Sequence, residues 1–78
     1  MKLFHIGGGN YINGDRLLSA VTPDSAPIKR VISDARDKNL LIDASYGKRT
    51  KSVLILDSGH VVLSFKSFEA IAEAKADE

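Results

Sequence analysis

The sequence contains no cysteine and only two histidines. A chain without cysteine forms neither a disulfide bond nor a thiolate metal site, and two histidines offer little for a zinc centre. No apolar run approaches the 18 residues of a membrane-spanning helix, and only four residues separate Lys2 from a glycine cluster, too few for a signal peptide. We therefore expect a protein of the reducing cytoplasm, with no metal, no cofactor and no membrane association.

The chain is short, at 78 residues, and 44% of its residues are hydrophobic. A chain of this size buries only about 60% of the surface that it exposes when unfolded. Because neither a disulfide nor a metal is available to stabilise so small a core, self-association is the remaining means. The composition therefore predicts one globular domain over residues 1–78 that forms a homo-oligomer.

The net charge of +1 conceals an uneven distribution along the chain. Residues 67–78 carry four acidic residues and one lysine, whereas residues 1–66 carry ten basic and six acidic residues. A basic body with an acidic end is compatible with a polyanion-binding surface. Ordinary solvated surface charge explains the same imbalance equally well.

Apolar residues and turn formers predict a small α+β domain of mostly antiparallel hairpins, in the order β-β-β-α-β-β-β-α. The first strand covers residues 2–6 and ends at Gly7-Gly8-Gly9. Asn13-Gly14 is typical of a type I′ turn, and it predicts a hairpin between residues 11–12 and 17–21.

A central helix is expected to begin after Thr22. Asp24 or Ser25 is the expected N-cap, and Pro27 lies in the first turn, where its missing N–H is harmless. Asn39 is suited to the left-handed conformation that ends a helix. The residues of the apolar stripe are Ile28, Val31, Ile32 and Ala35. Pro27 and Ile28 are therefore predicted to support the fold and, through it, the contact between subunits.

Three more strands and a last helix are expected in the C-terminal half. The predicted strands cover residues 40–42, 52–56 and 60–65, and the apolar side of the helix holds Phe68, Ile71 and Ala72. The first of these strands is expected to be buried and to be followed by a polar connection over residues 43–50. The other two form a hairpin through residues 57–59, and Ser67 caps the helix.

The glycine motifs do not fit a nucleotide-binding site. A dinucleotide fingerprint needs glycine where Ile12 stands, and a Walker loop ending in Gly47-Lys48 needs glycine in place of Ile42 and a hydroxyl residue in place of Arg49. Tight turning of the backbone at residues 7–9, or close approach by a neighbouring subunit, is the better interpretation.

The remaining polar residues indicate no catalytic site. His5 and His60 are predicted to lie in strands as packed or hydrogen-bonded residues, and Asp43 and Asp57 are predicted to stabilise turns through backbone bonds. No serine has a credible histidine and aspartate partner in one motif. We therefore expect neither enzyme activity nor a small-molecule substrate.

The segment from Gly47 to Lys51 places Lys48, Arg49 and Lys51 on one predicted loop. Lysine and arginine donate to phosphate oxygens, and the Thr50 hydroxyl and backbone N–H groups add neutral donors. Arg16 is a second candidate contact. A solvated loop is an equally common explanation of such a cluster. On the predicted helix, Lys29 and Arg36 share one flank, whereas Arg30 lies near Asp34 and Asp37 and is expected to form i,i+4 ion pairs.

Four segments together resemble one family of bacterial proteins. They are Ile6-Gly7 with Gly9-Asn10, residues 23–30 (PDSAPIKR), residues 41–51 (LIDASYGKRTK) and residues 57–64 (DSGHVVLS). In order and spacing they resemble the RemA family of extracellular-matrix regulators, over roughly residues 2–72. A match over nearly the whole chain is far more specific than any single motif above.

The resemblance implies a cytoplasmic DNA-binding protein that activates biofilm-matrix and osmotic-stress genes. It also implies a ring-shaped homo-oligomer whose subunit is similar to the LytTR DNA-binding domain. The family's contacts with double-stranded DNA fall on Arg16, Lys48 and Arg49, with Lys51 in the same basic segment.

The chain departs from the family's usual Gly-Arg-Arg-Thr-Arg by carrying Lys48 and Lys51. Lysine keeps the charge but lacks the planar fork that binds phosphate or guanine bidentately. An alternative is a self-assembling module whose basic loop binds another polyanion, such as RNA or a phosphorylated ligand.

Overall fold

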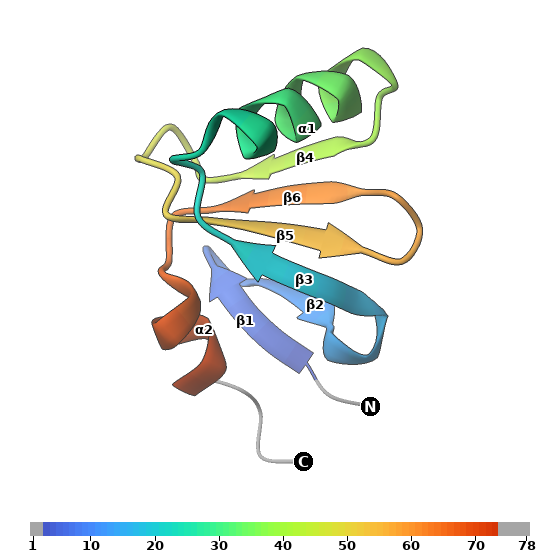
Figure 1. Cartoon of the computed structure of the whole chain (residues 1–78). Coiled ribbons are helices and arrows are strands. Elements are labelled where there is room, and N and C mark those ends of the chain that lie inside the picture. Colours follow the sequence, from blue (N-terminus) through green and yellow to red (C-terminus); the bar gives the residue numbers. More distant parts are fainter. Residues whose placement is uncertain (1–2, 74–78) are drawn as a thin grey trace.

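The computed structural model describes residues 3–73. In chain order the elements are β1 (Leu3–Gly7), β2 (Asn10–Asn13), the 3₁₀ turn η1 (Gly14–Arg16), β3 (Leu17–Val21), α1 (Ala26–Asp37), β4 (Leu41–Ala44), β5 (Ser52–Leu56), β6 (Val61–Ser64) and α2 (Phe68–Glu73). The predicted α+β class and the predicted order of strands and helices are confirmed (Figure 1).

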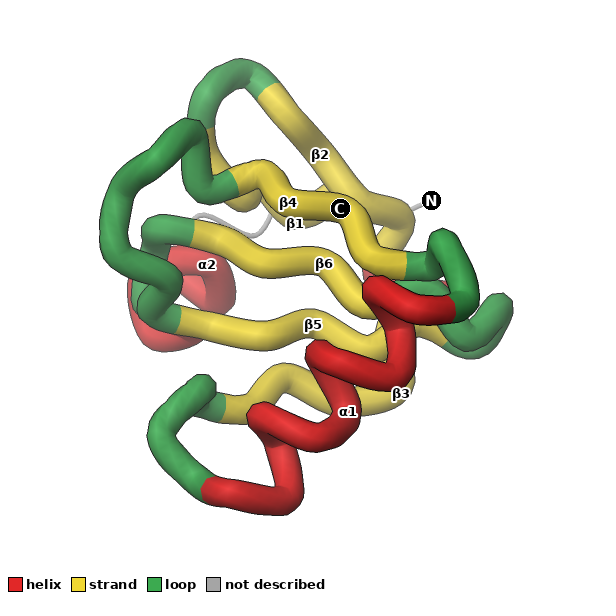
Figure 2. The backbone as a smooth tube through the Cα atoms, turned by 90° about the horizontal axis from the view of Figure 1, so that it is seen from above, coloured by secondary structure: helices red, strands yellow, loops and turns green. Residues whose placement is uncertain are grey.

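A four-stranded sheet with the order β3-β5-β6-β4 forms the middle layer. Its β3–β5 and β5–β6 pairs are antiparallel, whereas β4 runs parallel to β6. Helix α1 lies across one face of this sheet, and the antiparallel β1–β2 hairpin and α2 lie on the other side (Figures 1 and 2). Strands β3 and β4 are the two edges of the sheet.

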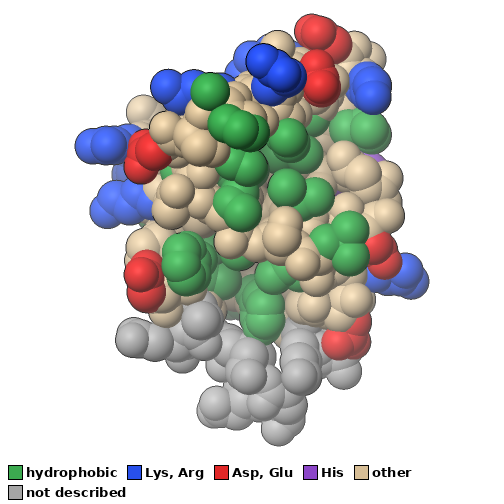
Figure 3. Space-filling view, viewed as in Figure 1, with side chains coloured by type: hydrophobic (Ala, Val, Ile, Leu, Met, Phe, Trp, Pro, Cys, Tyr) green, Lys and Arg blue, Asp and Glu red, His purple; other side chains and the backbone are tan. Residues whose placement is uncertain are grey.

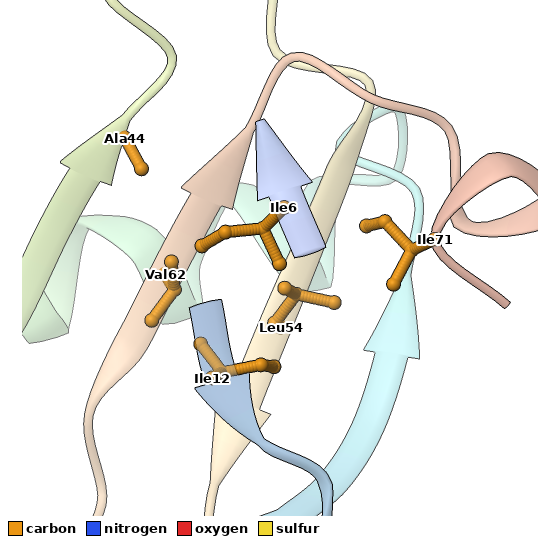
Figure 4. Close-up of a cluster of buried hydrophobic side chains, with 6 residues drawn as sticks. All are labelled: Ile6, Ile12, Ala44, Leu54, Val62 and Ile71. Atoms are coloured by element: carbon orange, nitrogen blue, oxygen red, sulfur yellow. The ribbon is translucent and has the colours of Figure 1, made fainter. Parts of the chain in front are cut away.

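Two hydrophobic clusters occupy the two faces of the sheet. Towards the hairpin and α2 lie Ile6, Ile12, Ala44, Leu54, Val62 and Ile71 (Figure 4). Towards α1 lie Ala35, Val53, Val61 and Leu63. Successive residues of β5 and β6 alternate between the clusters, so residues 53–56 and 61–63 are all apolar instead of alternating with polar residues. The central position of these strands explains why they are the clearest strands in the sequence.

Two buried serines join neighbouring segments of the chain. The Ser64 hydroxyl donates to the backbone oxygen of Ile6 (2.7 Å) and accepts from the N–H of Lys66 (3.1 Å). The Ser52 hydroxyl donates to the backbone oxygen of Lys66 (2.8 Å). A buried hydroxyl without a partner would destabilise the fold, so these bonds fix β1 and the end of β6 in place.

Local signals located the helices correctly. Ser25 is the N-cap of α1, its hydroxyl accepts from the N–H of Ile28, and Pro27 lies in the first turn. Asn39 has φ +60° directly after the helix, as predicted. At α2, the Ser67 hydroxyl accepts from the N–H of Ala70 (3.2 Å), and Ile71 is buried.

The predicted hairpin around Asn13-Gly14 is wrong. Asn13 has φ −79°, and its side chain accepts from the N–H of Asp15 to cap η1. The turn of the N-terminal hairpin is instead Gly7-Gly8-Gly9, where all three φ angles are positive. The chain leaves this hairpin through η1, and β3 pairs with β5 because that pairing closes the larger sheet.

The predicted buried strand at residues 40–42 is also partly wrong. Strand β4 begins at Leu41 and continues to Ala44, two residues into the expected polar connection. It lies at an edge of the sheet, and Ile42 is 47% exposed. A short apolar run does not distinguish a central strand from an edge strand, since that depends on which strands pair with it.

Candidate nucleic-acid interface

The connection between β4 and β5, residues 45–51, is called the basic loop here. It brings together the predicted contacts Lys48, Arg49 and Lys51, and all three are exposed. Its backbone is fixed near both ends, by a bond from the N–H of Lys48 to the oxygen of Ser45 (3.0 Å) and by one from Lys51 to Ser64 (2.8 Å). The three cations therefore belong to a loop whose backbone is held by hydrogen bonds near both ends.

An aspartate turn precedes the basic loop. Asp43 accepts hydrogen bonds from the Ser45 hydroxyl and from the Ser45 backbone N–H (2.9 Å), as expected for an aspartate at a strand end. These bonds hold the pKa of Asp43 below its usual value of 3.8, and the nearby Arg36 lowers it slightly further. The first turn of the loop is therefore stabilised by an ionised carboxylate.

Two consecutive residues in the left-handed region then reverse the chain. Tyr46 has φ +56° and Gly47 has φ +75°. Glycine adopts this region freely, whereas it is unfavourable for tyrosine and needs support from surrounding contacts. That support comes from the Tyr46 hydroxyl, which accepts from Asn10 (2.8 Å) and donates to the backbone oxygen of Gly8 (3.3 Å).

Lys48 is the best oriented cation of the basic loop. Its ammonium group lies over the ring of Phe65, 4.5 Å from the ring centroid. A cation over an exposed aromatic face gains about 0.5–1 kcal/mol, enough to favour one side-chain direction. The charge stays exposed and available to a ligand.

Arg49 and Lys51 border a groove of about 280 Å³. Its other sides come from the segment before α1, residues 22–24, and from the start of α2, residues 67–69. Lysine and arginine side chains gather along the upper left and top of the molecule in Figure 3, where Figure 1 shows the basic loop and α1. Carboxylates lie among these cations in the same view, and the groove is lined by Asp24 and Glu69 as well as by Arg49 and Lys51. This end of the molecule is therefore of mixed charge, and the basic loop itself carries only cations.

Arg16 does not join the basic loop. It lies at the other end of β5, where its guanidinium contacts Asp57 at 3.1 Å and its backbone oxygen accepts from the N–H of Asp57. Strand β5 is five residues long, so its ends are about 14 Å apart. The Arg16 side chain is 68% exposed, and an exposed ion pair contributes at most about 1 kcal/mol. Arg16 can therefore exchange Asp57 for a phosphate at little cost.

The other predicted charges and the helix residues are placed as follows. Lys29, Arg30 and Arg36 are exposed on α1. The expected ion pairs of Arg30 with Asp34 and Asp37 are not formed. Within residues 3–73, the one salt bridge is Arg16–Asp57. Pro27 is exposed at the start of α1, and Ile28 packs against the cluster beneath the helix.

A second groove, of about 630 Å³, lies between β2 and β4. Its floor is apolar and its rim polar. The floor includes Ile6, Ile12, Ala44, Leu56 and Val62, and the rim includes Asn10, Asn13, Arg16, Asp43, Tyr46, Asp57 and Ser58. The exposed Ile42 belongs to the same groove, which thus adjoins the free edge of the sheet.

The two histidines are hydrogen-bonded or packed, as predicted. His60 does not lie in a strand as predicted but directly before β6, with its Nδ1 2.6 Å from the Ser58 hydroxyl. His5 Nδ1 is 3.4 Å from the Lys66 ammonium, and its ring lies 5.0 Å from that of Tyr11. Across residues 3–73, histidine, aspartate and glutamate form no group of three that could hold a metal. No helix in that range has the length and apolar character needed to cross a membrane.

The aromatic and glycine residues near Lys48 were not identified from the sequence. Tyr46 and Phe65 lie far apart in the chain, and Gly7 and Gly8 were interpreted only as a turn or as a contact with another subunit. The available signal was three adjacent glycines together with two aromatic residues in a chain of 6% aromatic content.

Comparison with known proteins identifies one family of similar proteins. Residues 3–74 match the RemA-like family, described as extracellular matrix regulatory protein A-like. The chain is 53% identical to extracellular matrix regulatory protein A of Bacillus subtilis over 72 residues, 92% of this chain and 81% of that protein. Relatives from Acaryochloris marina (57% over 72 residues, 92% and 82%) and Brevibacillus brevis (53% over 73 residues, 94% and 85%) are named in general terms as regulatory proteins.

These names describe regulatory proteins rather than enzymes. The match covers both sheets, α1 and the whole basic loop, so it includes every element of the candidate interface. The chain therefore belongs to the RemA-like family of extracellular matrix regulatory proteins.

Proposed function

We propose that this protein is a cytoplasmic DNA-binding regulator that activates transcription of extracellular-matrix genes. The observation that carries the proposal is the basic loop, in which Lys48, Arg49 and Lys51 are exposed on a backbone anchored at both ends. Cations in this arrangement suit phosphate oxygens. Its family membership supports the regulatory role, and the name of the Bacillus subtilis relative supports the connection with the matrix.

One copy of the loop supplies too few contacts for tight binding. Three phosphate contacts give modest affinity, and the affinity falls steeply as salt rises. An assembly that repeats the loop along one duplex multiplies the effect without any new type of contact. We therefore propose that the active form is a homo-oligomer that presents several basic loops to the same DNA.

The edges of the four-stranded sheet support a cyclic, head-to-tail assembly. Both β3 and β4 have an unpaired outer edge within the described residues, and these strands carry Leu18 (69% exposed) and Ile42 (47% exposed). Free apolar edges invite pairing with another chain. If β3 of one copy meets β4 of the next and the rotation closes, a ring results with no free edge. The apolar groove beside β4 would then be covered by the neighbouring copy.

Binding to three polyanions tests the functional proposal. Fluorescence anisotropy compares duplex promoter DNA, single-stranded RNA and heparin at matched salt. We expect duplex DNA to bind most tightly, because its regular spacing of phosphates suits repeated loops. Preference for RNA, or equal binding of all three, would replace the proposal with the alternative of a general polyanion-binding module. Addition of the protein to a transcription assay on a bound promoter should raise transcript levels.

Sedimentation tests the assembly. The wild-type protein should form a closed oligomer at micromolar concentration, and Ile42→Lys should dissociate it by placing a charge in the contact. Ser33→Lys adds the same charge to an exposed position on α1 and should leave the oligomer intact. A well-folded wild-type monomer of 8.4 kDa would contradict the proposal.

A further inference from the structure

Two aromatic rings cover the glycine turn at residues 7–9. The ring of Phe65 lies against Gly7, where an added Cβ would come within 2.6 Å of the ring carbon Cζ. The ring of Tyr46 lies so close to Gly8 that an added Cβ would overlap it. At Gly9 a Cβ would have no neighbour within 4 Å, although φ there is also positive. The absence of a side chain is thus required at Gly7 and Gly8 by ring contacts and at Gly9 by backbone conformation alone.

One ring belongs to the basic loop, and the other lies beside it. Tyr46 is part of the loop itself, and its unfavourable φ is compensated by hydrogen bonds to Asn10 and to the oxygen of Gly8. Phe65 directly follows β6 and lies 6.4 Å from Tyr46, centroid to centroid. We call Tyr46 and Phe65, seated on Gly7 and Gly8, the aromatic clamp.

One ring of the aromatic clamp, that of Phe65, contacts one cation of the basic loop. The ammonium of Lys48 lies 4.5 Å from the centroid of Phe65, so the ring limits the directions in which this side chain can point. No comparable aromatic contact is found for Arg49 or Lys51 within residues 3–73. A lysine already oriented loses less conformational entropy when it binds a phosphate.

We propose that Tyr46 and Phe65 are positioning residues for DNA binding, which hold Lys48 in its phosphate-binding direction by packing on the glycine turn. The inference rests on the proposed function. It assigns to the glycines a role in recognition beyond turning the chain. The clamp adds no charge, and it acts through Lys48 rather than by touching DNA.

The pair Gly8→Ala and Gly9→Ala tests this role. Both substitutions impose the same kind of backbone strain in the same turn, but only Gly8→Ala displaces the Tyr46 ring. We expect Gly8→Ala to weaken duplex DNA binding about two- to tenfold, which corresponds to ordering one long side chain on binding. Gly9→Ala should bind like the wild type. Equal affinities for the two variants would overturn the proposal.

A double-mutant cycle separates positioning from general damage to the loop. In a Lys48→Ala background, Gly8→Ala should cause no further loss of affinity, because the residue on which the clamp acts is gone. The same loss in both backgrounds would show that the whole loop had moved, and would overturn the proposal. If Gly8→Ala does not fold, Phe65→Leu replaces it in the cycle, since leucine keeps apolar bulk and removes the aromatic face.

A measurement without DNA completes the test. In NMR spectra of the free protein, the ring of Phe65 should shift the Lys48 side-chain protons upfield, and Phe65→Leu should abolish the shift. An absent shift in the wild type would overturn the proposal. Failure of the proposed function looks different, because then the wild type and Arg49→Ala would bind duplex DNA equally poorly. Failure of the clamp alone leaves the effect of Arg49→Ala intact.

Discussion

Replacement of Arg49 by alanine gives the sharpest prediction for the DNA surface. Arg49 is exposed and forms no ion pair among residues 3–73, so its removal should disturb neither the fold nor the assembly. Each phosphate contact contributes about −0.9 to the slope of log affinity against log salt. The three cations of the basic loop therefore give a slope of about −2.7 for each engaged subunit. Arg49→Ala should reduce it to about −1.8.

The difference is large enough to measure. Between 50 and 200 mM salt, a slope of −2.7 corresponds to about a 40-fold loss of affinity, and each contact contributes a factor of about 3.5. When several subunits bind one duplex, their slopes add and their fold-losses of affinity multiply. Arg16 would add to the wild-type slope only if phosphate replaced Asp57, and that addition would be the same in Arg49→Ala.

Fluorescence anisotropy of a labelled duplex across the salt series supplies the measurement. Arg30→Ala is the matched control, because it removes one unpaired arginine from α1 without touching the basic loop. Native mass spectrometry should show the same oligomer for all three proteins. If the slope of Arg49→Ala equals that of the wild type in an intact oligomer, the basic loop does not contact DNA.

Four further predictions concern the basic loop, the turn before it and helix α1. Lys48→Arg should strengthen duplex binding slightly in the same assay, because guanidinium also stacks on Phe65 and adds a bidentate fork; weaker binding would contradict this. Ile28→Asp should lower the free energy of unfolding by about 2–4 kcal/mol or abolish assembly, because it places a charge against the cluster beneath α1. Pro27→Ser should have a smaller effect, and unchanged circular dichroism and oligomer size in Ile28→Asp would refute the assigned helix face. Because the folded state lowers the pKa of Asp43, its stabilising effect is present above about pH 4 and is lost as pH falls through the folded pKa. Asp43→Ala should thus lower the melting temperature more at pH 7 than at pH 3, and an equal difference at both values would contradict the assigned cause.

The basic loop shows how far the sequence predicts the candidate site. The cluster Lys48, Arg49 and Lys51 is visible in the sequence because the three cations are neighbours in the chain, and the structure brings them together. The distance of Arg16 from them is not visible, because it depends on β3 pairing with β5 in antiparallel register. The aromatic clamp joins residues up to 58 positions apart, a relation that no local pattern encodes.

The sequence by itself determined the elements whose signals are local. Ser25, Pro27 and Asn39 define the ends of α1, and the β5–β6 hairpin follows from two apolar runs around a short turn. Capping groups and turn residues act within a few residues, so their preferences are visible in the segment itself.

Only the tertiary structure decided how β3 and β4 pair. Asn13-Gly14 favours a type I′ turn locally, but pairing of β3 with β5 completes a sheet that is buried on both faces, and that burial outweighs the preference of one dipeptide. Likewise, the parallel β4–β6 pair and the edge position of Ile42 follow from the path of α1 across the sheet. Strand pairing is governed by the apolar surface that the whole molecule can bury, and that quantity belongs to the folded chain rather than to any segment of it.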